Sequence, residues 1–255
     1  ILIAGLHTMV IYKATGHSLK ASYIFCFLTL AFILYSTFLT KTGILCDSSV
    51  HSFTDPGMAT NIMIGFFVSL FSITPLIYFF IHSKKIPQEL KEERLDSREF
   101  WMFIGSLVFF LSAMFIIAKT SIPVYNKIFG SHIAEPEDRE FSYNKVMIMV
   151  AIIIGTLTAI TQYFKYKQTP STYTIKKIAL PTLIAAIITA LLAVFYPFTY
   201  TKQGIGFLAA IYVASFASIY GVVANANYIF VGLKGNIKSA GGSVAHIGFA
   251  LMLLG

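Results

Sequence analysis

Long uncharged apolar runs alternate with short polar segments along the 255 residues of this chain. About 20 apolar residues cover the hydrocarbon core of a bilayer as a helix. Six runs reach that length: residues 21–40, 61–81, 100–118, 146–164, 178–201 and 203–233. Shorter runs at 1–12 and 239–255 predict two truncated helices. The pattern predicts an all-α, polytopic integral membrane helix bundle of about eight transmembrane helices, forming a single domain over 1–255.

The composition favours a membrane protein over a soluble domain. Hydrophobic residues make up 56% of the chain and charged residues 12%, and a soluble fold of this size could not bury so much apolar surface. The sequence carries no Gly-rich phosphate loop, HExxH pair or Ser/His/Asp set, which argues against nucleotide and hydrolase chemistry. Because Ile1 begins inside an apolar run without an initiator methionine, we expect a fragment of a longer chain.

Basic residues concentrate in alternate loops. Thirteen of the 19 fall on one side of the predicted bundle: Lys13, Lys20, Lys84, Lys85, Lys91, Arg94, Arg98, Lys165, Lys167, Lys176, Lys177, Lys234 and Lys238. The positive-inside rule makes that side cytoplasmic. The loops 43–60 and 119–145 then face outward, which in a bacterial inner membrane means the periplasm.

Two histidines, His7 and His246, lie inside uncharged stretches near opposite ends of the chain. His7 precedes Lys13 by about 9 Å of helix and His246 follows Lys238 by about 12 Å, so we expect both at one depth. An imidazole in a bilayer needs a polar partner or a function. A lone one is usually explained by a hydrogen bond to a neighbouring helix, whereas two at one level match the axial ligands of a haem iron.

A third candidate ligand, His51, lies in an outer loop between Asp47 and Asp55. Either carboxylate could orient the imidazole through the ring nitrogen that does not face iron. Asp55-Pro56 is equally a turn signal, so both interpretations of Asp55 stay open.

Around His51 the chain reads Thr37-Phe-Leu-Thr-Lys-Thr-Gly-Ile-Leu-Cys-Asp-Ser-Ser-Val-His51-Ser-Phe-Thr-Asp-Pro56. This stretch resembles the outer motif TFLxRSGxLxSVHxF…DP of the CcmF/NrfE haem lyases of cytochrome c maturation. Four more segments resemble motifs of that family in the same order: Leu6-His7-Thr8, Ser97-Arg98-Glu99, Phe141-Ser-Tyr-Asn144 and Ala240-Gly-Gly-Ser-Val-Ala-His246-Ile-Gly248. The likeness covers essentially the whole chain. The family's tryptophan-rich segment is absent, and we expect it to precede Ile1 in the longer protein.

The resemblance implies a haem lyase (holocytochrome c synthase) component. It implies that His7 and His246 ligate a transmembrane haem b, and that His51 is an axial ligand of the haem to be attached. The chemistry would be thioether formation between haem vinyl groups and the thiols of a Cys-x-x-Cys-His motif, with no residue of this chain assigned to catalysis. The implied partners are apocytochrome c, a haem chaperone, thiol-reducing accessory subunits and membrane lipid, with no nucleic acid.

Two other functions stay open. A secondary transporter could relay protons through intramembrane histidines, but it would also show broken helices, inverted repeats or an acidic residue in a span. The six long runs contain no Asp or Glu. The second alternative is a non-catalytic assembly scaffold that only recruits apocytochrome.

Several further residues invite structural interpretations. Asn225 and Asn227 are predicted to bind neighbouring helices in preference to a haem propionate. Arg98, beside Glu99, is expected to cap or anchor the start of a helix. Gly206, Ala210 and Ala214 form a small-residue face that predicts close helix packing.

Overall fold

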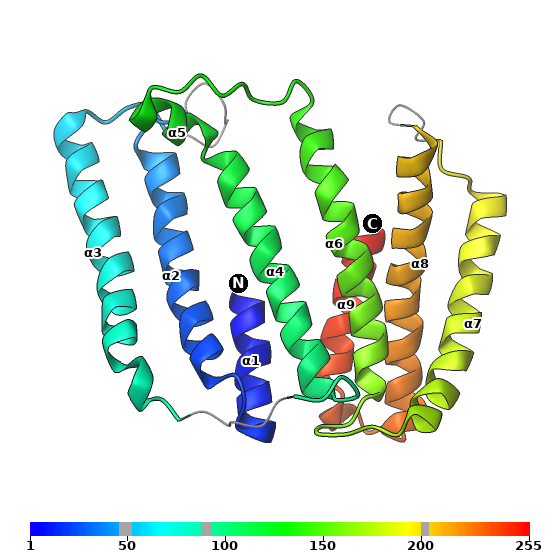
Figure 1. The fold of residues 1–255 in the computed structure, drawn as a ribbon. Coiled ribbons are helices and arrows are strands. Elements are labelled where there is room, and N and C mark those ends of the chain that lie inside the picture. Colours follow the sequence, from blue (N-terminus) through cyan, green and yellow to red (C-terminus); the bar gives the residue numbers. More distant parts are fainter. Residues whose placement is uncertain (46–52, 88–92, 200–203) are drawn as a thin grey trace. The chain divides into compact units, whose positions relative to one another are not determined.

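In the computed structural model the chain is all-helical, and the structure describes residues 1–45, 53–87, 93–199 and 204–255. None of these residues forms a strand. Six helices are long and apolar enough to cross a membrane (Figure 1). The prediction of an all-α fold is confirmed, and the chain is a multi-pass membrane protein.

The six long helices are α2 (Leu19–Lys41), α3 (Met58–His82), α4 (Arg98–Thr120), α6 (Arg139–Ile160), α7 (Ser171–Phe195) and α8 (Ile205–Asn227). Shorter helices are α1 (Leu2–Thr15), α5 (Ile122–Phe129) and α9 (Gly241–Leu254). Single 3-10 turns follow α3 (Ser83–Lys85) and α6 (Thr161–Tyr163) and precede α9 (Ile237–Ser239). A π-helical turn (Tyr228–Gly232) continues α8.

The helices do not begin and end where the apolar runs do, because individual residues near the helix ends set the boundaries. α7 starts at Ser171, well before the apolar run at 178, because Lys176 and Lys177 continue the helix. It stops at Phe195, since Pro197 disfavours helical backbone in the residue that precedes it. α5 lies inside the segment expected to be a loop. Pro123 stands in its first turn, where a proline costs no hydrogen bond.

The long helices differ in how much of each is buried. One third of the apolar window of α6 and of α8 is buried (33% each), against 6% for α3 and for α4. A helix that is apolar on every side yet little buried presents its side chains to lipid. α6 and α8 therefore carry much of the buried apolar core of the helices in 138–255, whereas α3 is largely exposed.

The chain divides into two compact units. Unit 1 comprises Ile1–Leu90 and Phe109–Glu137, and unit 2 comprises Lys91–Val108 and Asp138–Gly255, so that α4 contributes to both. The prediction of a single domain stays a prediction.

In unit 1, α2 packs against α1 and α3. α1 and α2 are in contact at Gly5, where a Cβ would lie at the ordinary van der Waals distance of 3.5 Å from the Cβ of Phe25. At the far end of α2, the hydroxyl groups of Tyr35 and Ser121 lie 2.6 Å apart. Leu39 and Val124 then join α2 to α5 in a small apolar cluster.

In unit 2, α8 packs against α6, α7 and α9. Its contacts use small residues: a Cβ on Gly155 would lie 3.1 Å from Ala217, and one on Gly221 would lie 2.9 Å from Ala250. The close contacts therefore lie nearer the middle of α8 than expected. The prediction of close packing at Gly206 is wrong, because nothing lies within 4 Å of a Cβ built there.

Candidate functional site

His7 lies on α1 in unit 1, half-buried beside the residues that pack on α2. Its Nδ1 is 2.8 Å from the backbone carbonyl oxygen of Ile3, one helical turn earlier. A carbonyl oxygen can only accept, so Nδ1 must carry the proton. The neutral ring then has its lone pair on Nε2, which is the nitrogen that a metal-ligating histidine offers when Nδ1 donates to the protein.

His246 lies on α9 in unit 2, where its Nδ1 is 2.6 Å from Nε2 of Gln162. In this orientation the Gln162 amide donates to Nδ1, and the ring proton of His246 is on Nε2. The amide can make the same contact when rotated by 180°, with its oxygen accepting from Nδ1–H. Only the rotated amide places the lone pair of His246 on Nε2, so Gln162 selects the tautomer.

Gln162 lies in the short turn after α6, and two residues at the start of α4 bind that turn. The Arg98 guanidinium donates from Nε to the Thr161 carbonyl oxygen at 3.1 Å and from Nη2 to the Gln162 carbonyl oxygen. The buried carboxylate of Glu99 accepts from the backbone N–H of Lys167 at 2.8 and 3.1 Å. Arg98 therefore caps the end of α6. The sequence instead predicts that Arg98 caps or anchors the start of the helix to which it belongs, α4.

A second polar cluster joins α6 and α8. Asn225 is fully buried, and its side-chain amide donates to the carbonyl oxygens of Thr158 (3.1 Å) and Gly221 (2.8 Å). The Tyr163 hydroxyl donates to the carbonyl oxygen of Ala224 at 2.8 Å and accepts from Asn227 at 2.9 Å. The prediction that both asparagines bind neighbouring helices is confirmed.

The side of α9 that carries His246 offers room beside the helix. Gly242 lies about one helical turn before His246 on that side, and a Cβ built on Gly242 would meet no atom within 4 Å. Glycines in open space allow a flat ligand to approach the backbone. Open space at Gly242, one turn from the His246 imidazole, is compatible with a bound haem, and so is the Nδ1-protonated form of His7.

His7 and His246 belong to different units, so their pairing about one iron stays a prediction. His51 and Asp47 lie outside the described residues, and their predicted roles stay predictions as well. Within the described ranges, no three His, Cys, Asp or Glu side chains gather as they would around a bound metal ion.

Asp55, the remaining candidate, forms the turn that starts α3. Its Oδ1 accepts from the backbone N–H of Gly57 at 2.9 Å and from the side-chain amide of Asn61 at 2.8 Å. These two bonds, together with the charge of Lys127, lower the pKa of the Asp55 carboxyl below its usual value. The turn interpretation of Asp55 is thus confirmed, and its role beside His51 stays a prediction.

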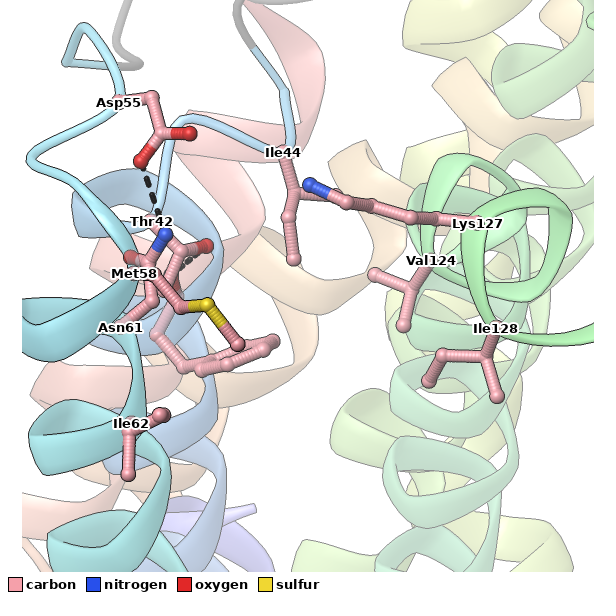
Figure 2. A pocket seen from close by; sticks show the side chains of 10 residues that line it. Thr42, Ile44, Asp55, Met58, Asn61, Ile62, Val124, Lys127 and Ile128 are labelled. Carbon is pink, nitrogen blue, oxygen red and sulfur yellow. Dashed lines mark hydrogen bonds between the residues drawn. The ribbon is translucent and has the colours of Figure 1, made fainter.

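A pocket of about 460 Å³ opens beside Asp55 in unit 1 (Figure 2). We name it the α5 pocket. Its apolar lining comes from α2, the segment after it, α3 and α5: Phe38, Ile44, Met58, Ile62, Val124 and Ile128. Its polar lining consists of Thr42, Asp55, Asn61 and Lys127.

Sequence reasoning missed Gln162 and Lys127. A lone glutamine at the end of an apolar run is a weak signal, because interfacial amides are common. Lys127 lies in the outward loop 119–145, and the sequence gives no sign of the short helix α5 that carries it.

Comparison with models of known protein families, with curated proteins and with solved structures found no match to this chain. The fold and the two units therefore define its class, a multi-pass all-α membrane protein. The more specific assignment depends on the motifs around the histidines.

Proposed function

We propose that this protein is a haem-binding membrane component of cytochrome c maturation, of the CcmF/NrfE haem lyase kind. It would lie in a bacterial inner membrane with residues 43–60 and 119–145 facing the periplasm. α1 and α9 would be two further membrane segments beside the six long helices, bringing the number to about eight.

The observation that carries the proposal is the hydrogen bonding of His7 and His246 at Nδ1. Each lies in an apolar helix, and each has its Nδ1 engaged by a protein group, Ile3 for His7 and Gln162 for His246. A bond at Nδ1 orients a histidine ring for ligation through Nε2 when Nδ1 carries the proton. The Ile3 carbonyl oxygen imposes that tautomer on His7, and for His246 the proposal requires the rotated Gln162 amide, whose oxygen accepts from Nδ1–H. The resemblance of the motifs around these two histidines to those of the CcmF/NrfE haem lyases supports the choice of family.

In this proposal His7 and His246 hold the iron of haem b, and His51 binds the haem that is to be attached. Bound haem supplies an iron centre that can change its redox state. The residues of this chain would position the haem ligands. Arg98 and Glu99 hold the turn that carries Gln162, Gln162 holds the His246 ring, and the apolar helices exclude water. Thioether formation would then occur on apocytochrome c presented at the outer loops, with haem chaperone and thiol-reducing subunits as partners.

The test is an oxidised and reduced absorption spectrum of the detergent-purified full-length protein beside a His7→Ala/His246→Ala double variant. We expect a low-spin b-type spectrum in the wild type and its loss in the double variant. His82→Ala is the matched control, because His82 also bonds through Nδ1 to a carbonyl one turn earlier, at 2.9 Å from Tyr78, but lies at the end of a helix beside Lys84.

A colourless wild-type protein, or a double variant that keeps the full spectrum, would contradict the proposal. The colourless result would favour the transporter or the scaffold, since neither needs haem. Cytochrome maturation measured with a His51→Ala variant then separates a lyase from a scaffold. If the protein is a lyase, the His51→Ala variant should lose haem attachment to apocytochrome c and keep the spectrum of the internal haem.

A further inference from the structure

The α5 pocket lies where lipid headgroups would meet the protein. α2 ends at Lys41 and α3 begins at Met58, and both helices are long and apolar enough to cross a membrane. The pocket is lined by the last turn of α2 and the first turns of α3. A site at the ends of two spans lies at the membrane–water interface. A lipid can enter such a site laterally from the bilayer.

The short helix α5 closes one side of this pocket and has the character of an interfacial helix. It places Val124 in the protein, with only 6% of that side chain exposed, and leaves Ile128 (67%) and Phe129 (75%) exposed. Exposed apolar residues on a short helix beside charged ones are typical of a segment lying in the headgroup region. The pocket therefore has protein on one side and acyl chains within reach.

Two opposite charges line the pocket. Figure 2 shows Lys127 extending from α5 toward Ile44 across the pocket, with Asp55 above the start of α3. Within the described residues the two side chains form no ion pair with each other, and the Lys127 ammonium has no hydrogen-bond partner. Asp55 uses Oδ1 for both of its described hydrogen bonds. The lining thus combines the Lys127 ammonium and the Asp55 carboxylate with an apolar surface.

We propose that the α5 pocket binds a phosphatidylethanolamine molecule, with its phosphate at Lys127, its ammonium at Asp55 and an acyl chain against Phe38, Ile62 and Val124. The volume of about 460 Å³ lies in the range of about 300–1,000 Å³ that is usual for small-molecule sites. A cation paired with phosphate and a carboxylate paired with ammonium form charge-assisted hydrogen bonds.

The charges also decide which lipids are excluded. An anionic phosphatidylglycerol headgroup would satisfy Lys127 but would place no cation at Asp55. Phosphatidylcholine has a quaternary ammonium, which cannot donate a hydrogen bond to the Asp55 carboxylate. Phosphatidylethanolamine alone of the three supplies both a phosphate and an N–H donor.

The test is native mass spectrometry of the full-length protein in detergent, with equimolar phosphatidylethanolamine, phosphatidylglycerol and phosphatidylcholine. We expect the wild type to retain phosphatidylethanolamine preferentially. Lys127→Ala should lower its retention about tenfold, since a charge-assisted bond is lost. Lys127→Arg should keep it. Asp55→Asn should abolish the preference over phosphatidylglycerol, because the amide no longer repels an anion.

Lys145→Ala is the matched control. It removes one positive charge from α6, outside the α5 pocket, and should leave lipid retention unchanged. Equal retention of the three lipids by the wild type would overturn the proposal. So would equal losses in Lys127→Ala and Lys145→Ala, which would indicate ordinary boundary lipid. Circular dichroism of each variant separates loss of lipid from loss of fold.

Discussion

The side chains of Gln162 and His246 meet at 2.6 Å between Nε2 and Nδ1, although 84 residues separate them. Gln162 stands at the end of α6 and His246 near the start of α9. The contact therefore needs both helices in place. Arg98 stabilises it from a third helix through the carbonyl oxygen of Gln162. The imidazole of His246, on α9, is thus oriented by a turn that α4 holds.

Replacing Gln162 tests whether it positions His246. We expect Gln162→Leu to lower haem affinity by about 10- to 100-fold, the usual effect of removing a group that orients a metal-bound histidine. Gln162→Glu should preserve affinity, because a carboxylate accepts from Nδ1–H and keeps the lone pair on Nε2. Haem titration followed by absorbance measures both. Gln168→Leu, at an exposed position, is the control. An unaltered affinity in Gln162→Leu would refute the positioning role.

Removing Arg98 should destabilise unit 2. Arg98→Ala leaves the carbonyl oxygens of Thr161 and Gln162 without their charged donor, which costs about 1.5–3 kcal/mol for a hydrogen bond to a charged group. Arg98→Lys should recover only part of this, since an ammonium lacks the forked geometry. Chemical unfolding in detergent measures the loss. Arg94→Ala serves as the control because its ion pair with Asp96 is solvent-exposed, and it should change stability little.

Adding one methyl group between α6 and α8 should be harmful. A Cβ on Gly155 would lie 3.1 Å from the Ala217 Cβ and 3.2 Å from its backbone, which cannot move aside as a side chain could. We expect Gly155→Ala to cost about 1–3 kcal/mol by overpacking. Gly65→Ala in α3, where nothing lies within 4 Å, should instead be neutral or stabilise by about 0.5–1 kcal/mol. Thermal unfolding of the two variants side by side distinguishes packing from helix propensity.

The turn at Asp55 should weaken in acid. The bonds from Gly57 and Asn61 lower the pKa of the Asp55 carboxyl below its ordinary value of 3.8. Its contribution to stability is therefore complete above pH 3.8 and is lost as the pH falls through the lower pKa of the folded protein. Asn61→Ala should bring the pKa back toward 3.8 and move the acid loss to higher pH. Melting temperature as a function of pH measures the shift, and an identical pH profile in the variant would contradict the assignment.

The positions of the membrane helices could be predicted from the sequence, because the free energy of burying a residue in lipid depends mainly on that residue and its immediate neighbours. The run at 61–81 is extended by only a few residues in α3. Errors arose where local chemistry competed with hydropathy. Lys176 and Lys177 ended the predicted run although they continue α7, and Pro197 stopped that helix inside an apolar stretch.

The candidate site depended on tertiary structure for its details. The sequence identified His7 and His246 as polar groups inside apolar stretches, and the cost of leaving such groups unpaired is a local property. It could not identify Gln162 as the partner of His246, or the end of α6 as the partner of Arg98. Those choices depend on which helices pack together and how closely, and small contacts such as Gly155 with Ala217 decide that spacing. The sequence by itself therefore determined the helices and the polar residues within them, while helix packing decided which of those residues meet.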